Sequence, residues 1–333
     1  MRGGRLRADP RASGADRRLR PMLLFVLRRA ASAVGFSIAV VILVFFLLQV
    51  GGVDPARALL GEDATEAQVA QRAAELGTDR PPVEQFEQWV RSLPDGLGRS
   101  WATNLTIVES LRFRGPPTLS LAVGSILVTI LVGIPIGLVA GVRRGLTDRL
   151  LQILVIAAFA LPGFWLAMVL VSTVALNVNV IPAIGYTRLS SSPTQWFLGL
   201  ILPVTALAIS SIASVAQQFR NSVISVYSQE FVRTLRSRGL SEREILFRNV
   251  LRNASPPTIT IIALQSIAVL GGSVIVERVF SIQGLGSMAI DAVNNADMPA
   301  MMGVVVFSAL VVVGVTLLLD IAYGFANPKV RLQ

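Results

Sequence analysis

Long apolar blocks alternate with polar segments along this chain. Each block holds roughly 20 or more residues, the length that a helix needs to cross ~30 Å of hydrocarbon. The pattern predicts an all-α membrane protein with six transmembrane helices, at about residues 22–50, 118–141, 150–176, 197–216, 258–276 and 301–324. The first block could instead be a cleaved signal peptide. It is too long for that, and no clear small-residue cleavage site follows, so we favour an uncleaved span.

The polar segments predict how the chain is divided. We expect a disordered cytoplasmic tail at 1–21, a partly helical external region at 51–116 and a main membrane domain at 117–324 with a long loop at 217–257. Residues 325–333 form a second cytoplasmic tail. Pro135 and Pro162-Gly163 fall inside the second and third spans, where they either kink a helix beside a cavity or accommodate packing.

Charge supports this arrangement and fixes an orientation. The chain has 30 Lys and Arg against 20 Asp and Glu, a net charge of +10. Most of the basic residues lie in the N-terminal tail, the 142–149 turn, the 217–257 loop and the C-terminal tail. The positive-inside rule then puts both termini in the cytoplasm, which requires an even number of spans. We therefore interpret the basic charge as a topology signal and expect no nucleic-acid partner. Asp320 is expected to anchor the cytoplasmic end of the sixth span.

The composition excludes several kinds of chemistry. With no Cys and no His, the chain cannot form a disulfide, a Ser-His-Asp triad or a metal site that uses these residues. Its single lysine, Lys329, lies outside any glycine-rich phosphate loop, so we expect no ATP hydrolysis here and no cofactor bound by this chain. A stand-alone carrier or channel remains an alternative, although carriers usually place ionisable groups within the membrane. A membrane enzyme or a scaffold fits less well.

The segment between the fourth and fifth spans is too long for a simple turn. Its pattern predicts a helix, a break at Gly239 and a second helix that Ser241 and Glu244 cap reciprocally. Apolar residues at Phe231, Leu235, Leu240 and Ile245 alternate with charges. The segment is either a solvated basic loop at the lipid headgroups or a docking helix for a soluble partner.

These residues resemble the EAA loop of ABC-importer membrane subunits, with Arg233-Thr234-Leu235 in place of Glu-Ala-Ala and Gly239 as the loop glycine. The details are similar to the dipeptide/oligopeptide/nickel branch of bacterial permeases, over residue 22 to the C-terminus. The chain departs from the family pattern at Leu235, Pro256-Pro257 and Asn327. Other stretches that resemble motifs of this branch are Leu97-Gly98-Arg99-Ser100, Gly133-Ile134-Pro135-Ile136-Gly137, Leu161-Pro162-Gly163-Phe164-Trp165, Ile181-Pro182-Ala183-Ile184-Gly185-Tyr186, the stretch from Glu277 to Gly286, and Asn327-Pro328-Lys329-Val330-Arg331.

The resemblance implies a type I ABC importer permease fold and a set of partners. Two ATPase subunits would bind ATP and Mg and contact a coupling helix at Arg233, Thr234, Leu235, Gly239 and Leu240. The large first external loop is similar to that of B-type subunits, which pair with a second, C-type permease. A substrate-binding protein would deliver a peptide at the external region, in the inner membrane of a bacterium. Nickel or another small solute is the alternative substrate.

A peptide pore should avoid fixed charge at the midplane, and the spans here have none in their middles. Glu277 and Arg278 are expected at the external mouth, where they pair with each other or meet the binding protein. Polar residues within the spans line the pore or, alternatively, form interhelical hydrogen bonds. These residues are Ser125, Thr129, Ser172, Thr173, Thr205, Ser210, Ser211, Gln265, Ser266 and Ser273.

Overall fold

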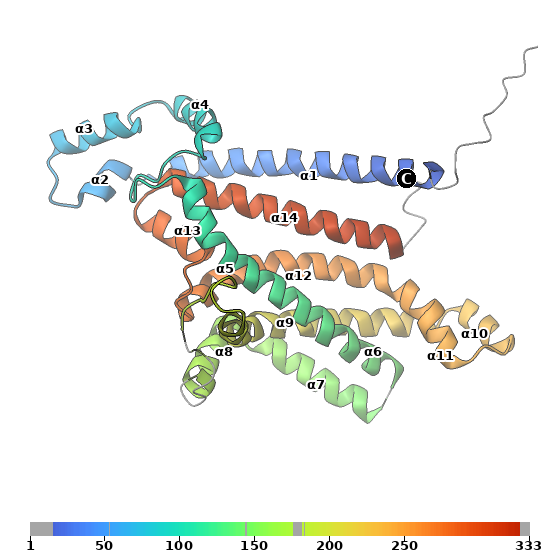
Figure 1. Cartoon of the computed structure of the whole chain (residues 1–333). Helices are drawn as coiled ribbons and strands as arrows, with labels where there is room; N and C mark the ends of the chain where they lie inside the picture. The colour runs from blue at the N-terminus through green and yellow to red at the C-terminus, as the bar shows by residue number, and fades with distance from the viewer. Residues whose placement is uncertain (1–15, 53, 144, 176–181, 183, 327–333) are drawn as a thin grey trace, which may run out of the picture.

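A computed structural model describes residues 16–52, 54–143, 145–175, 182 and 184–326. Five of its helical stretches are long and apolar enough to cross a membrane, and one further pair of helices is bent by 93°. Counting that pair as a broken span gives the six predicted spans. The long helices run side by side, with small helices at either end of the bundle (Figure 1). We call these ends the cap end, which carries α2, α3 and α4, and the loop end, which carries α10 and α11.

The first span is α1 (Asp16–Val50), which begins within the segment predicted to be a disordered tail. It packs along α14 (Met298–Ala326), the last span. Arg29 Nε lies 2.6 Å from the Asp320 carboxylate, so the acidic residue predicted as an interfacial anchor pairs with α1. The predicted C-terminal tail lies mostly outside the described residues.

Three short helices and one 3-10 turn make up the cap: α2 (Pro55–Leu60), α3 (Glu66–Leu76), α4 (Pro82–Ser92) and η1 (Leu93–Asp95). Asp54 accepts hydrogen bonds from the first turn of α2, and Thr65 forms a capping box with Gln68 at α3. Phe45 of α1 is 1% exposed and packs against the ring of Phe86 on α4. The region between the first two spans is partly helical, as predicted, although it ends before residue 116 because α5 begins at Ile107.

The second span begins at Ile107, well before the predicted Thr118. Thr106 and Glu109 form a capping box that starts the helix. It continues through α5 (Ile107–Val128), a π-helical turn η2 (Thr129–Gly133) and α6 (Ile134–Val142), with Pro135 in the first turn of α6. The third span is broken into two helices. The break falls at Pro162-Gly163, where the sequence alone leaves open either a kink beside a cavity or a packing accommodation. The span consists of α7 (Leu146–Ala160), α8 (Gly163–Leu170) and the π-helical turn η3 (Val171–Ala175), and Leu161, the residue before Pro162, is extended.

The fourth and fifth spans extend far into the predicted loop at 217–257. Helix α9 (Pro193–Tyr227) is one uninterrupted helix. On the other side, α11 (Glu242–Glu244), the π-helical η4 (Ile245–Val250) and α12 (Leu251–Val279) form one continuous stretch. Only residues 228–241 remain between them, and these include α10 (Glu230–Ser237). The last helix before α14 is α13 (Leu285–Asn294), at the cap end.

Helix α9 lies at the centre of the apolar core and packs on α12, α5 and α6. Gly133, Gly137 and Gly141 allow α6 to approach α9 closely. A Cβ atom on Gly137 would lie 2.4 Å from the Ala216 carbonyl oxygen, so no larger residue fits there without moving a helix. The second and fourth spans are therefore held together by direct backbone contact.

Candidate functional sites

The loop end presents the short helix α10 on an apolar foundation. Val232 on α10, Ile245 on η4 and Val223 on α9 have no exposed surface and belong to one cluster. Gly239 ends the α10 turn with φ at +83°, a conformation that favours glycine, and its N–H donates to the Arg236 carbonyl at 2.9 Å. The cluster joins α10 to the ends of both α9 and the α11–α12 stretch.

The five residues that resemble the coupling contact fall into two groups. Leu235 and Leu240 are half-buried and pack against the apolar cluster, so they anchor the loop from within. Arg233, Thr234 and Gly239 are exposed. The surface available to a partner is thus smaller and more polar than the sequence motif alone indicates.

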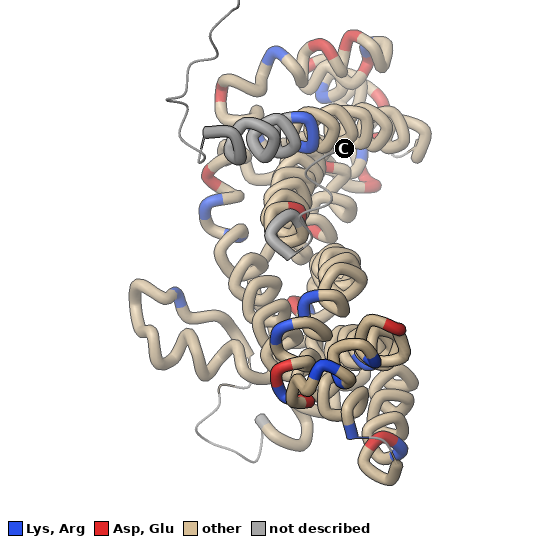
Figure 2. The backbone as a smooth tube through the Cα atoms, turned by 90° about the vertical axis from the view of Figure 1, so that its right-hand side faces the viewer, with Lys and Arg blue, Asp and Glu red and all other residues tan. Residues whose placement is uncertain are grey.

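Ion pairs cover the outside of this loop. Arg236 Nε lies 2.5 Å from Glu242, and the guanidinium stands 5.8 Å from the centre of the Tyr227 ring. The hydrogen bond that Arg236 donates to Glu242 raises the pKa of Arg236, which stays charged. Arg233 pairs with Glu230 at 3.1 Å. With the loop end facing the viewer, Figure 2 shows charged residues gathered on these turns while the long helices are almost free of charge.

The predicted capping box at Ser241 is only half present. The Ser241 hydroxyl accepts a hydrogen bond from the Glu244 N–H at 3.3 Å, as expected. The Glu244 carboxylate, however, pairs with Arg248 one turn further on rather than reaching back.

The candidate pore residues are spread over several helices, and most satisfy their hydroxyls locally. Thr205, Ser266, Ser273, Ser172 and Thr173 donate to carbonyl oxygens of their own helices. Ser210 is half-buried on α9.

The other hydroxyl candidates, Ser211, Ser125 and Thr129, do not bond to the backbone of their own helices. Ser211 on α9 donates to Gln265 on α12 at 3.2 Å, which is the interhelical alternative. Ser125 and Thr129 are buried beside α9, and neither side-chain oxygen has a hydrogen-bond partner. Hydrogen bonding within the bundle therefore does not account for these two hydroxyls.

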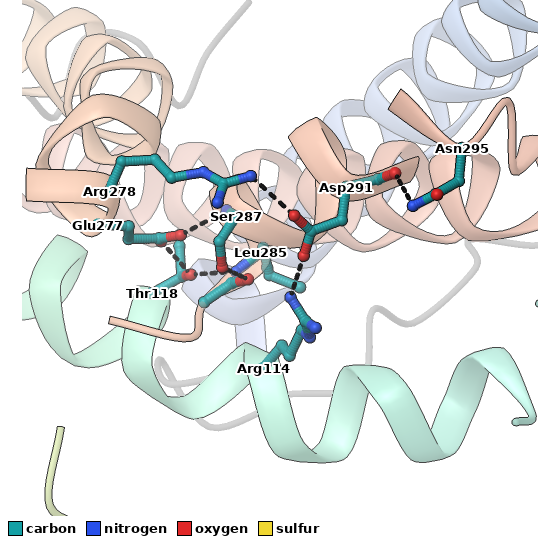
Figure 3. Close-up of polar contacts among 9 residues, drawn as sticks. Arg114, Thr118, Glu277, Arg278, Leu285, Ser287, Asp291 and Asn295 are labelled. Atoms are coloured by element: carbon teal, nitrogen blue, oxygen red, sulfur yellow. Dashed lines mark hydrogen bonds and ion pairs between the residues drawn. The ribbon is translucent and has the colours of Figure 1, made fainter. Parts of the chain in front are cut away.

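At the cap end, Glu277 and Arg278 do not pair with each other. Glu277, at the end of α12, has no exposed surface. The Thr118 hydroxyl of α5 donates to its carboxyl group at 2.5 Å, and the Ser287 N–H of α13 donates at 3.0 Å. Arg278 instead pairs with Asp291 on α13, which also binds Arg114 of α5 (Figure 3). A fully buried Glu277 cannot contact a docking protein in this conformation.

A second buried carboxylate lies at the other end of α13. Asp297 is 3% exposed and caps α14 by accepting from the Ala300 N–H at 3.1 Å. It also accepts from the Ser100 hydroxyl and from the Trp101 N–H, in the turn before α5. The roles of Asp297, Asp291 and Thr118 were not predicted from the sequence. A local signal existed for Asp297, because an Asp shortly before Pro299 is typical of a helix start.

Within the described residues, no group of three or more acidic side chains is placed to hold a metal ion. Hollows lie at the cap end. One, of about 580 Å³, is bounded by the ends of α1 and α14, by Trp101 and by Gln85 of α4. Its position between the cap and the membrane helices makes it part of the cap end rather than of the candidate pore.

Comparison with known proteins agrees with this architecture. Residues 133–332 match the family described as binding-protein-dependent transport system inner membrane component, and residues 22–97 match the N-terminal part of such components. A probable peptide ABC transporter permease of Sinorhizobium fredii is 33% identical, over 93% of this chain and 100% of that protein. A putative peptide transport system permease of Brucella abortus is 34% identical, over 93% and 99%. The dipeptide transport system permease of Escherichia coli K12 is 31% identical, over 93% and 99%.

Solved structures support the predicted fold. Two inward-facing structures of the MetNI methionine ABC transporter superpose with TM-scores of 0.52 and 0.54, at 17% and 16% identity. They cover 63% and 66% of this chain and 93% and 98% of theirs. At this identity the likeness shows the fold alone, and it confirms a type I importer permease fold. The chain therefore belongs to the family of binding-protein-dependent transport system inner membrane components, as a multi-pass protein of the inner membrane.

Proposed function

We propose that this chain is a pore-forming subunit of an ATP-driven peptide importer and that α10 is its coupling helix. Three relatives over nearly the full chain are described as peptide or dipeptide permeases, which supports a peptide as substrate. The cap end then faces outward, toward a substrate-binding protein, and the loop end and both termini face the cytoplasm.

One observation carries the coupling role. Helix α10 is joined through Val232 and Ile245 to the ends of the two long helices α9 and α12. Because a close-packed apolar cluster deforms little, a push on α10 moves both helices rather than bending the loop. A flexible basic loop at the headgroups would not need such a foundation.

The energy and the second half of the pore come from other chains in this proposal. Two ATPase subunits bind ATP and Mg and hydrolyse ATP, and they contact the exposed residues Arg233, Thr234 and Gly239. A second permease of the C type completes the pore. This chain carries no catalytic residue of its own, and its contribution is to transmit motion.

Substitution of Gly239 tests the coupling role. In the complex reconstituted in proteoliposomes, we expect Gly239→Arg to abolish peptide uptake while ATP hydrolysis continues, because φ at +83° disfavours any side chain and the bulk projects toward the partner. Gly145→Arg is the matched control, since Gly145 also has positive φ, open space around it and a place at a helix turn. Normal uptake by Gly239→Arg would refute the proposal.

Uptake assays in a strain lacking this permease test the substrate. We expect a series of peptides of increasing length to be taken up, each at a rate that depends on the binding protein. Uptake of nickel, with no uptake of any peptide in the series, would instead favour the small-solute alternative.

A further inference from the structure

Helix α13 begins on the buried carboxyl group of Glu277. The first N–H groups of a helix have no partner within the helix and must be satisfied from outside. Here the Ser287 N–H donates to Glu277 at 3.0 Å, and the Leu285 N–H donates to the Thr118 hydroxyl at 2.8 Å. Thr118 in turn donates to Glu277, so one small network joins α5, α12 and α13 (Figure 3).

The backbone around this network is shaped to fit the carboxyl group. A Cβ atom on Gly284 would lie 2.4 Å from the Glu277 side chain, and one on Gly286 would lie 2.9 Å from it. Both glycines therefore allow the start of α13 to come close to Glu277. A larger residue at either position would push the start of α13 away from Glu277.

The segment that follows α13 also contains a buried carboxylate, Asp297, which binds the turn before α5 and the start of α14. Asp297 binds Ser100 and the Trp101 N–H, which belong to the turn before α5, and the Ala300 N–H of α14. Between the two buried carboxyl groups, Asp291 pairs with Arg114 at 3.0 Å and with Arg278 at 2.7 Å. An apolar cluster fills the space beneath, formed by Ile107, Leu111, Leu285, Met288, Ala292, Ala300 and Val304.

We propose that Glu277 and Asp297 are positioning residues that fasten α13 to α5 and α12, so that a protein docking at the cap end acts on the pore helices through α13. The inference rests on the proposed function, because it assumes a binding protein that stimulates the ATPases. Breaking a buried polar network is costly because it leaves polar groups without a partner and away from water. Breaking a partly exposed ion pair costs little because water can hydrogen-bond to both groups instead. The two buried carboxyl groups therefore hold α13 in place, and Asp291 contributes little.

The test measures ATPase activity of the reconstituted complex against the concentration of binding protein. We expect Glu277→Ala to leave the basal rate unchanged and to bring the stimulated rate down close to the basal rate, a loss of at least about fivefold where the coupling between sites is in its typical range. Glu277→Gln should recover most of the stimulation, because its oxygen can accept from Ser287 and its amide can donate to Thr118. Asp291→Asn is the matched control at a partly exposed carboxylate on the same helix and should behave like the wild type.

A second variant keeps the test decisive if Glu277→Ala does not assemble. Thr118→Val removes only the hydroxyl that links Glu277 to the Leu285 N–H, and it should show the same loss of stimulation at an unchanged basal rate. The inference is overturned if both variants respond like the wild type. It is also overturned if basal and stimulated rates fall together, as a purely structural role would produce. A wild-type complex that its binding protein does not stimulate would instead refute the proposed function.

Discussion

The two ends of the molecule are held together by opposite means. At the loop end, α10 rests on buried apolar residues such as Val232 and Ile245, and its charges lie on the outside. At the cap end, α13 is held by buried carboxyl groups, Glu277 and Asp297, in addition to an apolar cluster. Apolar contact is not directional, whereas hydrogen bonds fix an orientation. The loop end is thus held by apolar packing without directional contacts, while hydrogen bonds at the cap end specify one arrangement of three helices.

Removing a buried carboxylate at the cap end should have the largest effect on stability. Asp297→Ala leaves up to four donors without an acceptor, namely the Ser100 hydroxyl and the N–H groups of Trp101, Ala102 and Ala300. We expect a loss of roughly 4 kcal/mol, at about 1–3 kcal/mol for each unsatisfied group with partial relaxation. Thermal unfolding of the detergent-solubilised complex measures it. A variant as stable as the wild type would show that the cap end relies on apolar contact alone.

Truncating an apolar anchor at the loop end should have the next largest effect. Ile245 is fully buried, and Ile245→Ala should destabilise the fold by about 3 kcal/mol through lost contacts and the cavity left behind. Ile245→Val, which removes one methylene group, should lose only about 1 kcal/mol. If Ile245→Ala and Ile245→Val destabilise the fold equally, the size of the cavity does not determine the loss. Apolar packing would then not be what holds the loop end together.

An exposed charge at the loop end should affect coupling and not stability. Arg233 and Glu230 form an exposed pair, and replacement of such residues usually changes stability by less than about 0.5 kcal/mol. We expect Arg233→Ala to unfold at the wild-type temperature and yet to transport less peptide for each ATP hydrolysed. Unchanged coupling would remove Arg233 from the ATPase contact and leave Thr234 and Gly239.

The smallest effect is expected between the two ends. The Thr129 hydroxyl is buried and has no hydrogen-bond partner, so Thr129→Val should leave stability unchanged or raise it by up to about 1 kcal/mol. Uptake should also be unchanged if the hydroxyl only packs against α9. Reduced uptake at unchanged stability would instead place Thr129 on the substrate pathway.

What the sequence could predict depended on how local each signal was. The apolar blocks predicted the spans, and Gly239 with Ser241 predicted the break in the loop, because these features lie within a few residues of one another. The contact between Thr118 and Glu277 joins residues 159 positions apart, and no pattern in the sequence around either residue predicts it. A single sequence does not record which distant polar groups meet, so the cap-end network became visible only in the fold.

The errors in helix boundaries have a different origin. Thr106 and Glu109 gave a local signal for the early start of α5. Arg112 and Arg114 follow within the next two turns, and such charged residues are typical of a segment outside the membrane. Similarly, the polar residues Gln217, Gln218 and Arg220 follow the predicted end of the fourth span at 216, although α9 continues to Tyr227. Hydropathy marks where a helix leaves the hydrocarbon and not where it ends. The sharp break at Pro162 was located correctly, but its 93° angle depends on packing against the rest of the bundle.

The length of α9 has a further consequence. Its 35 residues span about 52 Å at 1.5 Å per residue, well beyond the ~30 Å of hydrocarbon. The length of α9 therefore sets both the distance of α10 from the membrane and its angle around the axis of α9. One residue inserted after Gln217 would lift α10 by only about 1.5 Å but would rotate it by about 100° around the axis of α9. The proposed ATPase subunits would then meet α10 at nearly the same distance from the membrane, but its exposed residues would point in another direction.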